Sequence, residues 1–362
     1  MLFNKRNKTR VVKIGNVPVG GTNLISVQSM TNTDTRNATG TLEQINRIHK
    51  LGGDIVRVAV PDIKAAEALP EIVNNSPIPV VADIHFDYRL ALKAIEAGVA
   101  KLRINPGNIG DRKNVEIVAQ AAIEKNVPIR IGVNAGSLEN ELAQAVREKR
   151  ISLGEAMCRS ALAQAAILEE CDFHDIIISV KASSVQETFE AYKKLAELCD
   201  YPLHIGITEA GSANTGIIKS SVGIGALLAE GIGDTIRVSL TGPPEEEIIV
   251  GRKILQSLGL RPYGPEIISC PTCGRTEVDV LKISKELEEK IKNNTEINKK
   301  NCKIAVMGCV VNGPGEASSA DIGFAGGKDC GIIFRNGEKI CKVSAENAVN
   351  KLIEILKKCE TD

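Results

Sequence analysis

The sequence of 362 residues contains no tryptophan, only four tyrosines and six phenylalanines, and no excess of either charge. Lys and Arg together number 45, as do Asp and Glu, so the formal net charge is zero. Such a chain lacks the positive field and the aromatic stacking surfaces that nucleic-acid binding uses. No apolar run approaches the ~18 residues of a membrane span, and no apolar segment follows the basic N-terminus as in a signal peptide. We therefore expect no nucleic-acid partner, no membrane association and a cytoplasmic location.

Apolar residues make up 43% of the chain and charged residues 25%, the composition of an ordinary folded protein. The ten cysteines are the unusual feature. In a chain without an export signal, cysteines stay reduced and point to metal binding more than to disulfides. The composition therefore predicts a soluble enzyme with a metal site.

Short apolar segments alternate with helical stretches from Leu24 to Gly259. The predicted strands are 24–28, 54–60, 78–83, 101–104, 127–133, 175–181, 202–208 and 234–240. The first helix is predicted over Thr41–Leu51, with Thr41 and Gln44 spaced as a capping box. Eight strands within about 235 residues fit a parallel (β/α)8 TIM-type barrel of the α/β class, typically about 250 residues long. A doubly wound sheet is the alternative, but no Gly-rich dinucleotide fingerprint follows an early strand.

The segments on either side of the barrel differ from it in pattern. Before it, residues 10–19 predict a hairpin that turns at Gly15–Asn16 and plugs the barrel floor. After it, a Pro-containing linker is expected near 259–266, and seven of the ten cysteines follow residue 269. Helices are predicted at 277–293 and 344–358, and strands at 303–309, 321–326, 331–337 and 339–343. We expect two domains: a substrate-binding barrel over 1–259 and a small α+β domain over 260–362.

Charged and polar side chains stand within or just after different barrel strands, where active sites of this fold lie. The cations are Arg57, Arg103, Arg130, Lys181 and Arg237, accompanied by Asn134 and Ser239. Each alone is compatible with a solvated loop residue, but together they are costly in apolar strands unless they are paired or functional. Because arginine suits bidentate phosphate recognition, the pattern favours a polyanionic ligand such as a diphosphate.

Two carboxylates and one histidine accompany these cations. Asp83 and Glu209 either balance the positive charge or act as acid or base, and the sequence does not choose between these roles. His85 is a donor to the substrate or a structural hydrogen-bond partner. His204 follows no ligand spacing, and we interpret it as an ordinary residue.

The cysteines after residue 269 suggest a metal centre. Cys270 and Cys273 form a C-x₂-C pair on a Pro turn, and Cys309 opens the Gly-rich segment that leads to Glu316. A lone C-x₂-C is most often a zinc knuckle, but the second pair here, Cys302 with Cys309, has an unusually long spacing for zinc. Three cysteines with an oxygen ligand would instead suit an iron–sulfur cluster. Cys302 is otherwise compatible with a buried thiol.

Six segments together carry a family resemblance: SVQSMTNTDTR (26–36), VADIHFDYRLAL (81–92), KLRINPGNIG (101–110), GITEAG (206–211), ISCPTCGRT (268–276) and VMGCVVNGPGEA (306–317). They resemble the two-domain bacterial 4-hydroxy-3-methylbut-2-enyl diphosphate synthases of the methylerythritol phosphate route to isoprenoids. The resemblance covers nearly the whole chain, and the last two motifs are highly specific.

The resemblance implies an oxidoreductase that opens and dehydrates 2-C-methyl-D-erythritol 2,4-cyclodiphosphate with two electrons. It implies one 4Fe–4S cluster per chain, held by Cys270, Cys273, Cys309 and Glu316, and diphosphate contacts from Arg57, Arg103, Arg130, Lys181, Arg237 and Ser239. It places Asp83, His85, Asn134 and Glu209 in the polar pocket, with Glu209 as the candidate acid. The implied partners are flavodoxin or ferredoxin as electron donor and a second copy of the chain in a homodimer. The rival interpretations are an iron–sulfur electron carrier and a zinc-stapled lyase acting on a phosphorylated substrate.

Overall fold

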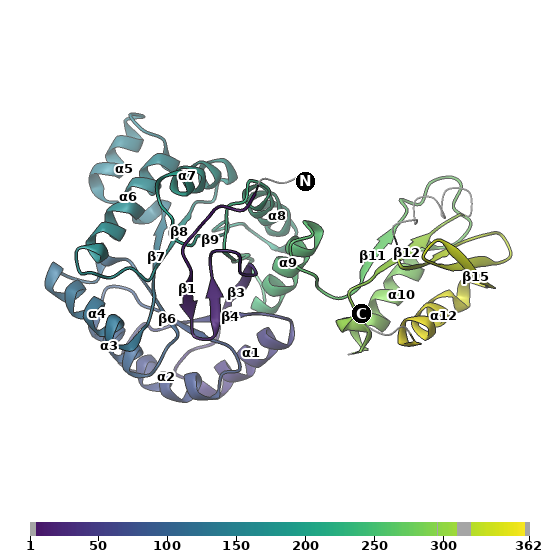
Figure 1. The fold of residues 1–362 in the computed structure, drawn as a ribbon, viewed down its shortest axis with the longest axis horizontal. Helices are drawn as coiled ribbons and strands as arrows, with labels where there is room; N and C mark the ends of the chain where they lie inside the picture. The colour runs from purple at the N-terminus through teal and green to yellow at the C-terminus, as the bar shows by residue number, and fades with distance from the viewer. Residues whose placement is uncertain (1–4, 295, 310–319, 359–362) are drawn as a thin grey trace. The chain divides into compact units, whose positions relative to one another are not determined.

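The computed structural model describes residues 5–294, 296–309 and 320–358. The chain divides into two compact units, Met1–Arg261 and Pro262–Asp362, coloured purple to green and green to yellow in Figure 1. Within the described ranges, no helix has the length and apolar character required to cross a membrane.

The first unit is built around eight parallel strands. In chain order they are β3 (Ser26–Met30), β4 (Ile55–Ala59), β5 (Val80–Asp83), β6 (Lys101–Ile104), β7 (Ile129–Asn134), β8 (Ile176–Lys181), β9 (His204–Ile205) and β10 (Thr235–Ile236). Hydrogen bonds connect them in the order β8-β7-β6-β5-β4-β3-β10-β9. A parallel bridge between Ile178 and Leu203 joins the two ends, so the sheet closes into a barrel. The predicted (β/α)8 barrel is confirmed.

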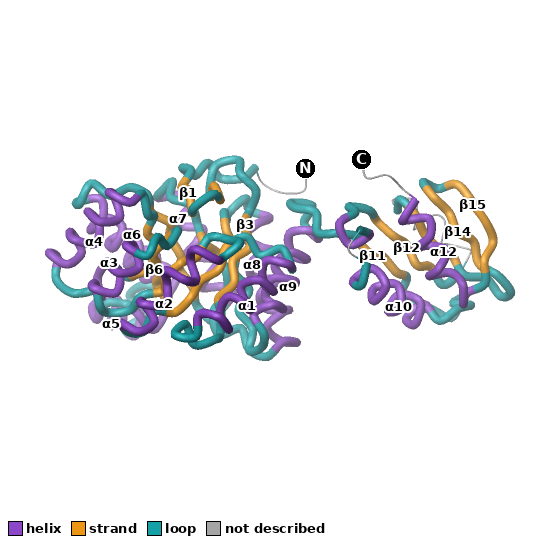
Figure 2. The backbone as a smooth tube through the Cα atoms, turned by 90° about the horizontal axis from the view of Figure 1, so that it is seen from below, coloured by secondary structure: helices purple, strands orange, loops and turns teal. Residues whose placement is uncertain are grey.

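Helices surround the barrel (Figures 1 and 2). They are α1 (Ala38–Lys50), α2 (Ile63–Asn75), α3 (Tyr88–Glu96), α4 (Arg112–Lys125), α5 (Asn140–Arg147), α6 (Leu153–Glu169), α7 (Val185–Leu198), α8 (Ala213–Ala229) and α9 (Pro244–Ser257). Short 3₁₀ turns lie at Pro106–Asn108 and Ala135–Ser137. The predicted start of the first helix at Thr41 is wrong, because Asn37 caps it by accepting a hydrogen bond from the Gly40 amide.

A short hairpin plugs one end of the barrel. Strands β1 (Val12–Ile14) and β2 (Val17–Val19) pair antiparallel around Gly15, whose φ of 57° suits a glycine in a tight turn. Val12, Ile14 and Val19 are buried in one apolar cluster with the strand residues Ile55, Val81 and Ile177. These three lie near the amino-terminal ends of their strands, so the hairpin closes the barrel floor as predicted and leaves the opposite end open.

The second unit is a mixed five-stranded sheet covered by two helices. Strands β11 (Glu266–Ser269), β12 (Lys303–Met307) and β13 (Ile322–Ala325) run parallel, and β14 (Gly331–Arg335) and β15 (Glu338–Val343) continue antiparallel. Helices α10 (Val280–Lys292) and α12 (Ala345–Lys358) pack their apolar faces on the sheet, and a 3₁₀ turn lies at Ile297–Lys299. The sequence did not predict β11, because its four residues lie directly after the expected linker.

We expect the hairpin plug to stabilise the barrel unit. Ile14 is fully buried, so Ile14→Ala should lower the free energy of unfolding of this unit by about 2–5 kcal/mol. The measurement is denaturant unfolding followed by circular dichroism. Val11→Ala, at a neighbouring position that is 51% exposed, is the matched control and should change stability little. Equal effects of the two substitutions would contradict the plug.

Candidate functional site

A polar pocket of about 160 Å³ lies at the open, carboxyl-terminal end of the barrel. Every strand from β4 to β10 contributes to it; the lining residues are Arg57, Asp83, His85, Arg103, Arg130, Gly132, Asn134, Ser179, Lys181, Thr208, Arg237 and Ser239. The structure thus brings together all of the predicted barrel residues except Glu209. Gly132, Ser179 and Thr208 were not predicted, although Gly132 and Ser179 each lie two residues from a predicted residue along a strand and Thr208 directly precedes Glu209.

Strand geometry explains why these side chains converge. Residues two apart on a strand point to the same face, so Ser179 with Lys181 and Arg237 with Ser239 reach the barrel interior together. Glycine supplies the space for two long cations. A Cβ on Gly132 would lie 2.6 Å from Arg103 Nε, and one on Gly206 would lie 2.3 Å from the backbone oxygen of Arg237 and 3.0 Å from Lys181 Nζ. Both positions therefore require the absence of a side chain.

Asp83 is the only carboxylate among the lining residues. Its side chain is 9% exposed and lies 3.7 Å from Arg57 Nε, 3.3 Å from Arg103 Nη1 and 3.4 Å from His85 Nε2. Burial alone would raise the pKa of Asp83, but Arg57, His85 and Arg103 together hold this pKa below its usual range. Asp83 is therefore an ionised carboxylate that pairs two arginines, which favours the balancing role over an acid role.

The remaining cations have few partners. Arg130 is 2% exposed, and its Nε and Nη2 atoms have no hydrogen-bond partner among the described residues. Burial, reinforced by Arg57 and Arg103, lowers the pKa of Arg130 well below its ordinary value. Burial and then Arg130 and Arg237 lower the pKa of Lys181, and burial lowers that of Arg57 to about 10. Buried cations that repel one another favour the binding of an anion between them.

Arg237 is positioned by a residue that the sequence did not reveal. Glu247 in the first turns of α9 accepts hydrogen bonds from Arg237 Nη2 at 3.3 Å, from the Leu240 amide at 3.2 Å and from Ser29 Oγ at 2.6 Å. Glu247 is the last of three consecutive acids, a pattern typical of a helix N-terminus. Its burial distinguishes it from Glu245 and Glu246. The helical period is the sequence signal that could have placed Glu247 on the buried face of α9.

Glu209 lies just outside the pocket. It follows Thr208, which lines the pocket, and its backbone is left-handed with φ of 51°. Phe86, beside His85, shares this conformation with φ of 67° and is 73% exposed. Bulky residues adopt left-handed backbone rarely, and such residues cluster at functional sites. Two loops at the rim of the pocket therefore hold side chains in constrained positions.

Two of the predicted cluster cysteines, Cys270 and Cys309, lie at one end of the second sheet. Cys270 directly follows β11 and Cys309 lies two residues after β12, its parallel neighbour (Figure 1). The Gly308 amide donates to Cys270 Sγ at 3.1 Å, the kind of contact that tunes cluster thiolates. The backbone amide of Arg275 lowers the pKa of the exposed Cys273. These soft donors fit an iron–sulfur cluster.

Cys302 is placed differently from these cysteines. It precedes β12, so the five strand residues, about 16 Å of extended chain, separate it from the end that carries Cys309. This separation disfavours a zinc site that uses Cys302 and Cys309 together. Glu316 lies outside the described residues, and within them no three His, Cys, Asp or Glu side chains are gathered as a metal site.

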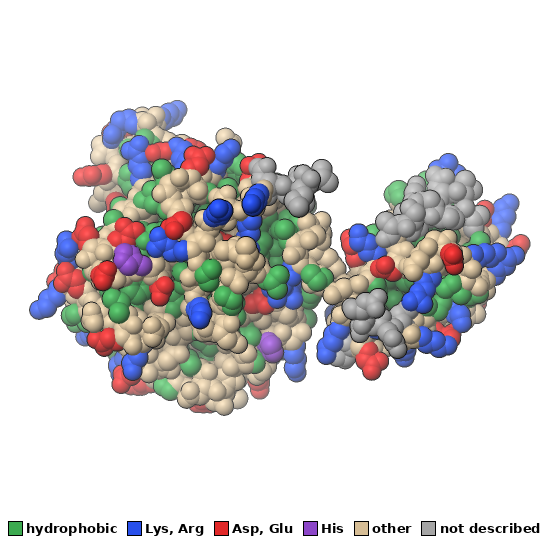
Figure 3. All heavy atoms as spheres, in the orientation of Figure 1, with side chains coloured by type: hydrophobic (Ala, Val, Ile, Leu, Met, Phe, Trp, Pro, Cys, Tyr) green, Lys and Arg blue, Asp and Glu red, His purple; other side chains and the backbone are tan. Residues whose placement is uncertain are grey.

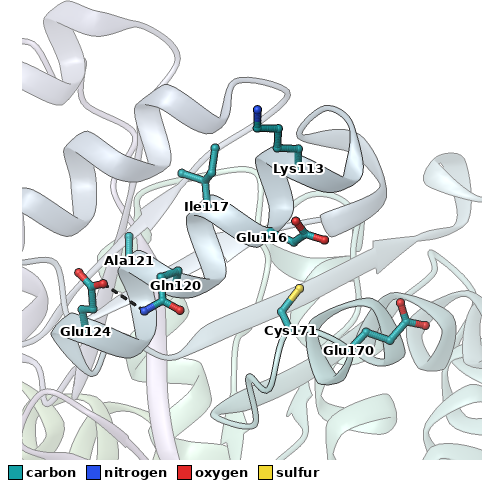
Figure 4. Close-up of a pocket in the computed structure, with 8 residues that line it drawn as sticks. All are labelled: Lys113, Glu116, Ile117, Gln120, Ala121, Glu124, Glu170 and Cys171. Carbon is teal, nitrogen blue, oxygen red and sulfur yellow. Dashed lines mark hydrogen bonds between the residues drawn. The ribbon is translucent and has the colours of Figure 1, made fainter.

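A second hollow, on the outer surface of the barrel unit, has a different lining. A larger groove beside α4 and the end of α6 is lined by Lys113, Glu116, Ile117, Gln120, Ala121, Glu124, Glu170 and Cys171 (Figure 4). No strand end reaches it, and its Gln120 and Glu124 side chains bond to each other at 3.1 Å. On the face drawn in Figure 3, cationic and acidic side chains are interspersed over this unit.

The fold and the pocket define a TIM-barrel protein with a cationic anion-binding mouth and an appended mixed-sheet domain. The model of the GcpE TIM-barrel domain matches residues 9–252, and that of the GcpE protein C-terminal domain matches residues 266–358. The chain belongs to the GcpE family, and the resemblance inferred from its motifs is confirmed.

Three curated relatives show how close the similarity is. The 4-hydroxy-3-methylbut-2-en-1-yl diphosphate synthases (flavodoxin) of Clostridium acetobutylicum and Clostridium perfringens are each 57% identical to this chain. The alignments cover 96% and 97% of this chain and 98% and 99% of those proteins. The synthase of Geobacter sulfurreducens is 55% identical over 97% of this chain and 98% of its own length.

Proposed function

We propose that this protein converts 2-C-methyl-D-erythritol 2,4-cyclodiphosphate to (E)-4-hydroxy-3-methylbut-2-enyl diphosphate by reductive ring opening and dehydration. Two relatives that bear the name of that synthase align with this chain over 98% and 99% of their length. The observation in the structure that supports the proposal most strongly is the pocket itself. Five cations from separate strands face one lining carboxylate, and the unpartnered Arg130 donors require acceptor oxygens.

The barrel residues bind and orient the diphosphate. Arg57, Arg130 and Lys181 supply donors to the phosphate oxygens, and Asp83 keeps Arg57 and Arg103 in place. The diphosphate is also the group that leaves the ring carbon, so these cations stabilise the negative charge that develops as the carbon–oxygen bond breaks. Glu209 at the rim is the candidate donor of the proton that leaves with the hydroxyl as water.

A 4Fe–4S cluster would be held by Cys270, Cys273, Cys309 and Glu316 in the second domain. Bound there, it supplies the two electrons of the reaction one at a time. The three cysteine thiolates would hold three of the irons, and the Glu316 carboxylate would be a harder and weaker ligand for the fourth. We place the diphosphate in the barrel domain, 1–259, and the cluster in the small domain, 260–362.

The electrons come from a separate protein. The sequence has no dinucleotide-binding fingerprint of its own, and the relatives are named for flavodoxin. We propose flavodoxin, or a ferredoxin, as the donor.

Removing a pocket cation should weaken substrate binding without affecting the cluster. For Arg57→Ala, Arg103→Ala, Arg130→Ala and Lys181→Ala, loss of a charge-assisted contact of about 1.5–3 kcal/mol predicts a KM raised about ten- to over a hundredfold. Steady-state kinetics with a reduced donor, together with the visible spectrum, is the measurement. Wild-type kinetics in all four variants would place the diphosphate elsewhere.

Two further variants complete this comparison. Arg112→Ala, on the outer helix α4 with a side chain that is 67% exposed, is the matched control and should behave as wild type. Glu209→Gln should bind the substrate normally and turn it over slowly, because it removes a proton donor and not an anion contact. Unchanged turnover would remove Glu209 from the acid role.

The cluster assignment predicts opposite behaviour for Cys302 and Glu316. Cys302→Ser should keep the cluster and the activity, whereas Glu316→Ala should lose most activity and make the cluster labile to oxygen. Iron and sulfide analysis of anaerobically purified protein, with a visible spectrum, gives the measurement and separates a cluster from zinc. Four-cysteine ligation, or full activity of Glu316→Ala, would contradict the assignment.

We also propose a homodimer in which each barrel pocket meets the cluster of the partner. Arg57→Ala should have little activity at substrate concentrations well below its raised KM, and Cys270→Ser should be inactive. Mixing the two under these conditions should then restore part of the activity, because a heterodimer contains one composite site with both residues intact. Each variant alone is the control. A strictly monomeric and fully active protein would contradict this arrangement.

A further inference from the structure

A second set of polar side chains lies inside the barrel beneath the pocket. Gln28 on β3, Lys101 on β6, His204 on β9 and Thr235 on β10, here called the buried polar layer, are each 0% exposed. Lys101 lies two residues before Arg103 and Thr235 two before Arg237, so both point to the same interior, one step of about 6–7 Å nearer the floor. Branched apolar side chains usually fill such an interior. A polar layer at this depth therefore requires an explanation.

Lys101 is the charged member of this layer. Its Nζ donates to Gln28 Oε1 at 3.2 Å across the barrel, and no carboxylate in the described part of the chain forms an ion pair with it. The charged and titratable groups that face the barrel interior around it are Arg57 on β4, Asp83 on β5, Arg103 on β6, Arg130 on β7, Lys181 on β8, His204 on β9 and Arg237 directly after β10. Asp83 already pairs with Arg57 and Arg103. Burial first, and then repulsion by Arg130 and Arg57, lowers the pKa of Lys101 well below its ordinary value.

The other members of the layer have unused hydrogen-bonding atoms. Gln28 Nε2, both ring nitrogens of His204 and Thr235 Oγ1 are buried and have no partner among the described residues. Groups of this kind are satisfied by ordered water in folded proteins. We expect water bound to these atoms to provide the route by which a proton reaches Lys101 from the pocket above.

We propose that a diphosphate bound in the pocket draws one proton from the solvent onto Lys101, and that the resulting buried charge strengthens the binding of the anion. This inference rests on the proposed function, which places a diphosphate at the barrel mouth. The amine takes up the proton without any other bond changing. Lys101 is a positioning residue, because it acts on the ligand through Arg130 and the field of the barrel rather than by contact.

The direction of the pH dependence follows from linkage. If the anion binds the protein more tightly when Lys101 is protonated, then bound anion raises the proton affinity of Lys101 by the factor by which protonation tightens anion binding. This factor is typically about 5- to 150-fold for coupled sites. Binding therefore takes up a proton, and affinity falls as pH rises above the lowered pKa of Lys101 in the unliganded protein.

Calorimetric titration with inorganic diphosphate tests this coupling. Repeating the titration in buffers of different ionisation enthalpy gives the number of protons taken up on binding. Protons exchanged by the ligand itself contribute equally to the wild type and the variants, so subtracting one proton number from the other removes them. Lys101→Met, neutral and similar in length, should bind about 5- to 150-fold more weakly and take up as much as one proton fewer. Lys101→Arg should keep the affinity and lose the proton uptake assigned to Lys101, since arginine stays ionised.

The outcomes separate this inference from the proposed function. If the wild type does not bind diphosphate, the pocket assignment fails. If the wild type binds it and Lys101→Met takes up the same number of protons with unchanged affinity, only the role of Lys101 is overturned. Titration of the wild type with sulfate, which carries no titrating proton near neutral pH, should also show proton uptake, and its absence would overturn the role even if neither variant folds. Lys64→Met, at an exposed position on α2, is the matched control and should behave as wild type.

Discussion

A closed barrel that encloses more positive charge than it can pair is the constraint on which this structure depends. Removing a charge from water costs several kcal/mol per ion, roughly, even after relaxation. Here Arg130 and Lys181 are almost completely buried. Among the described residues, Asp83 and Glu247 supply the negative charge that pairs with the pocket arginines. An anionic ligand at the mouth offsets the cost of burying these cations, so their repulsion in the unliganded protein favours binding of the anion.

Several other features follow from this constraint. The hairpin closes the floor of the barrel with apolar side chains, which leaves only the mouth open to a ligand. Gly132 and Gly206 give space to Arg103 and Lys181, and Glu247 fixes Arg237 from an outer helix. Each feature keeps a cation in one position before the ligand arrives, which is what electrostatic stabilisation of a leaving diphosphate requires.

Much of this could be predicted from the sequence, because the period of the strands and the positions of charges within them are local signals. The alternation of apolar segments with helical stretches predicts the eight strands, and the Gly15–Asn16 turn predicts the hairpin. The parallel arrangement of the strands then predicts that Arg57, Arg103, Arg130 and Lys181 gather at one end. What could not be predicted depends on burial and on neighbours distant in sequence. Glu247 belongs to a run of acids typical of a helix N-terminus, His204 was interpreted as an ordinary residue, and Lys101 was included only as the first residue of a predicted strand. β11 was missed because four residues after two prolines give too short a pattern.

The most direct test of the central claim is a crystal structure of the protein with the cyclic diphosphate bound. We expect phosphate oxygens within hydrogen-bond distance of Arg130 Nη2, Arg57 and Lys181 at the carboxyl-terminal mouth of the barrel. Phosphate density at another surface, with the mouth filled only by solvent at saturating ligand, would contradict the account.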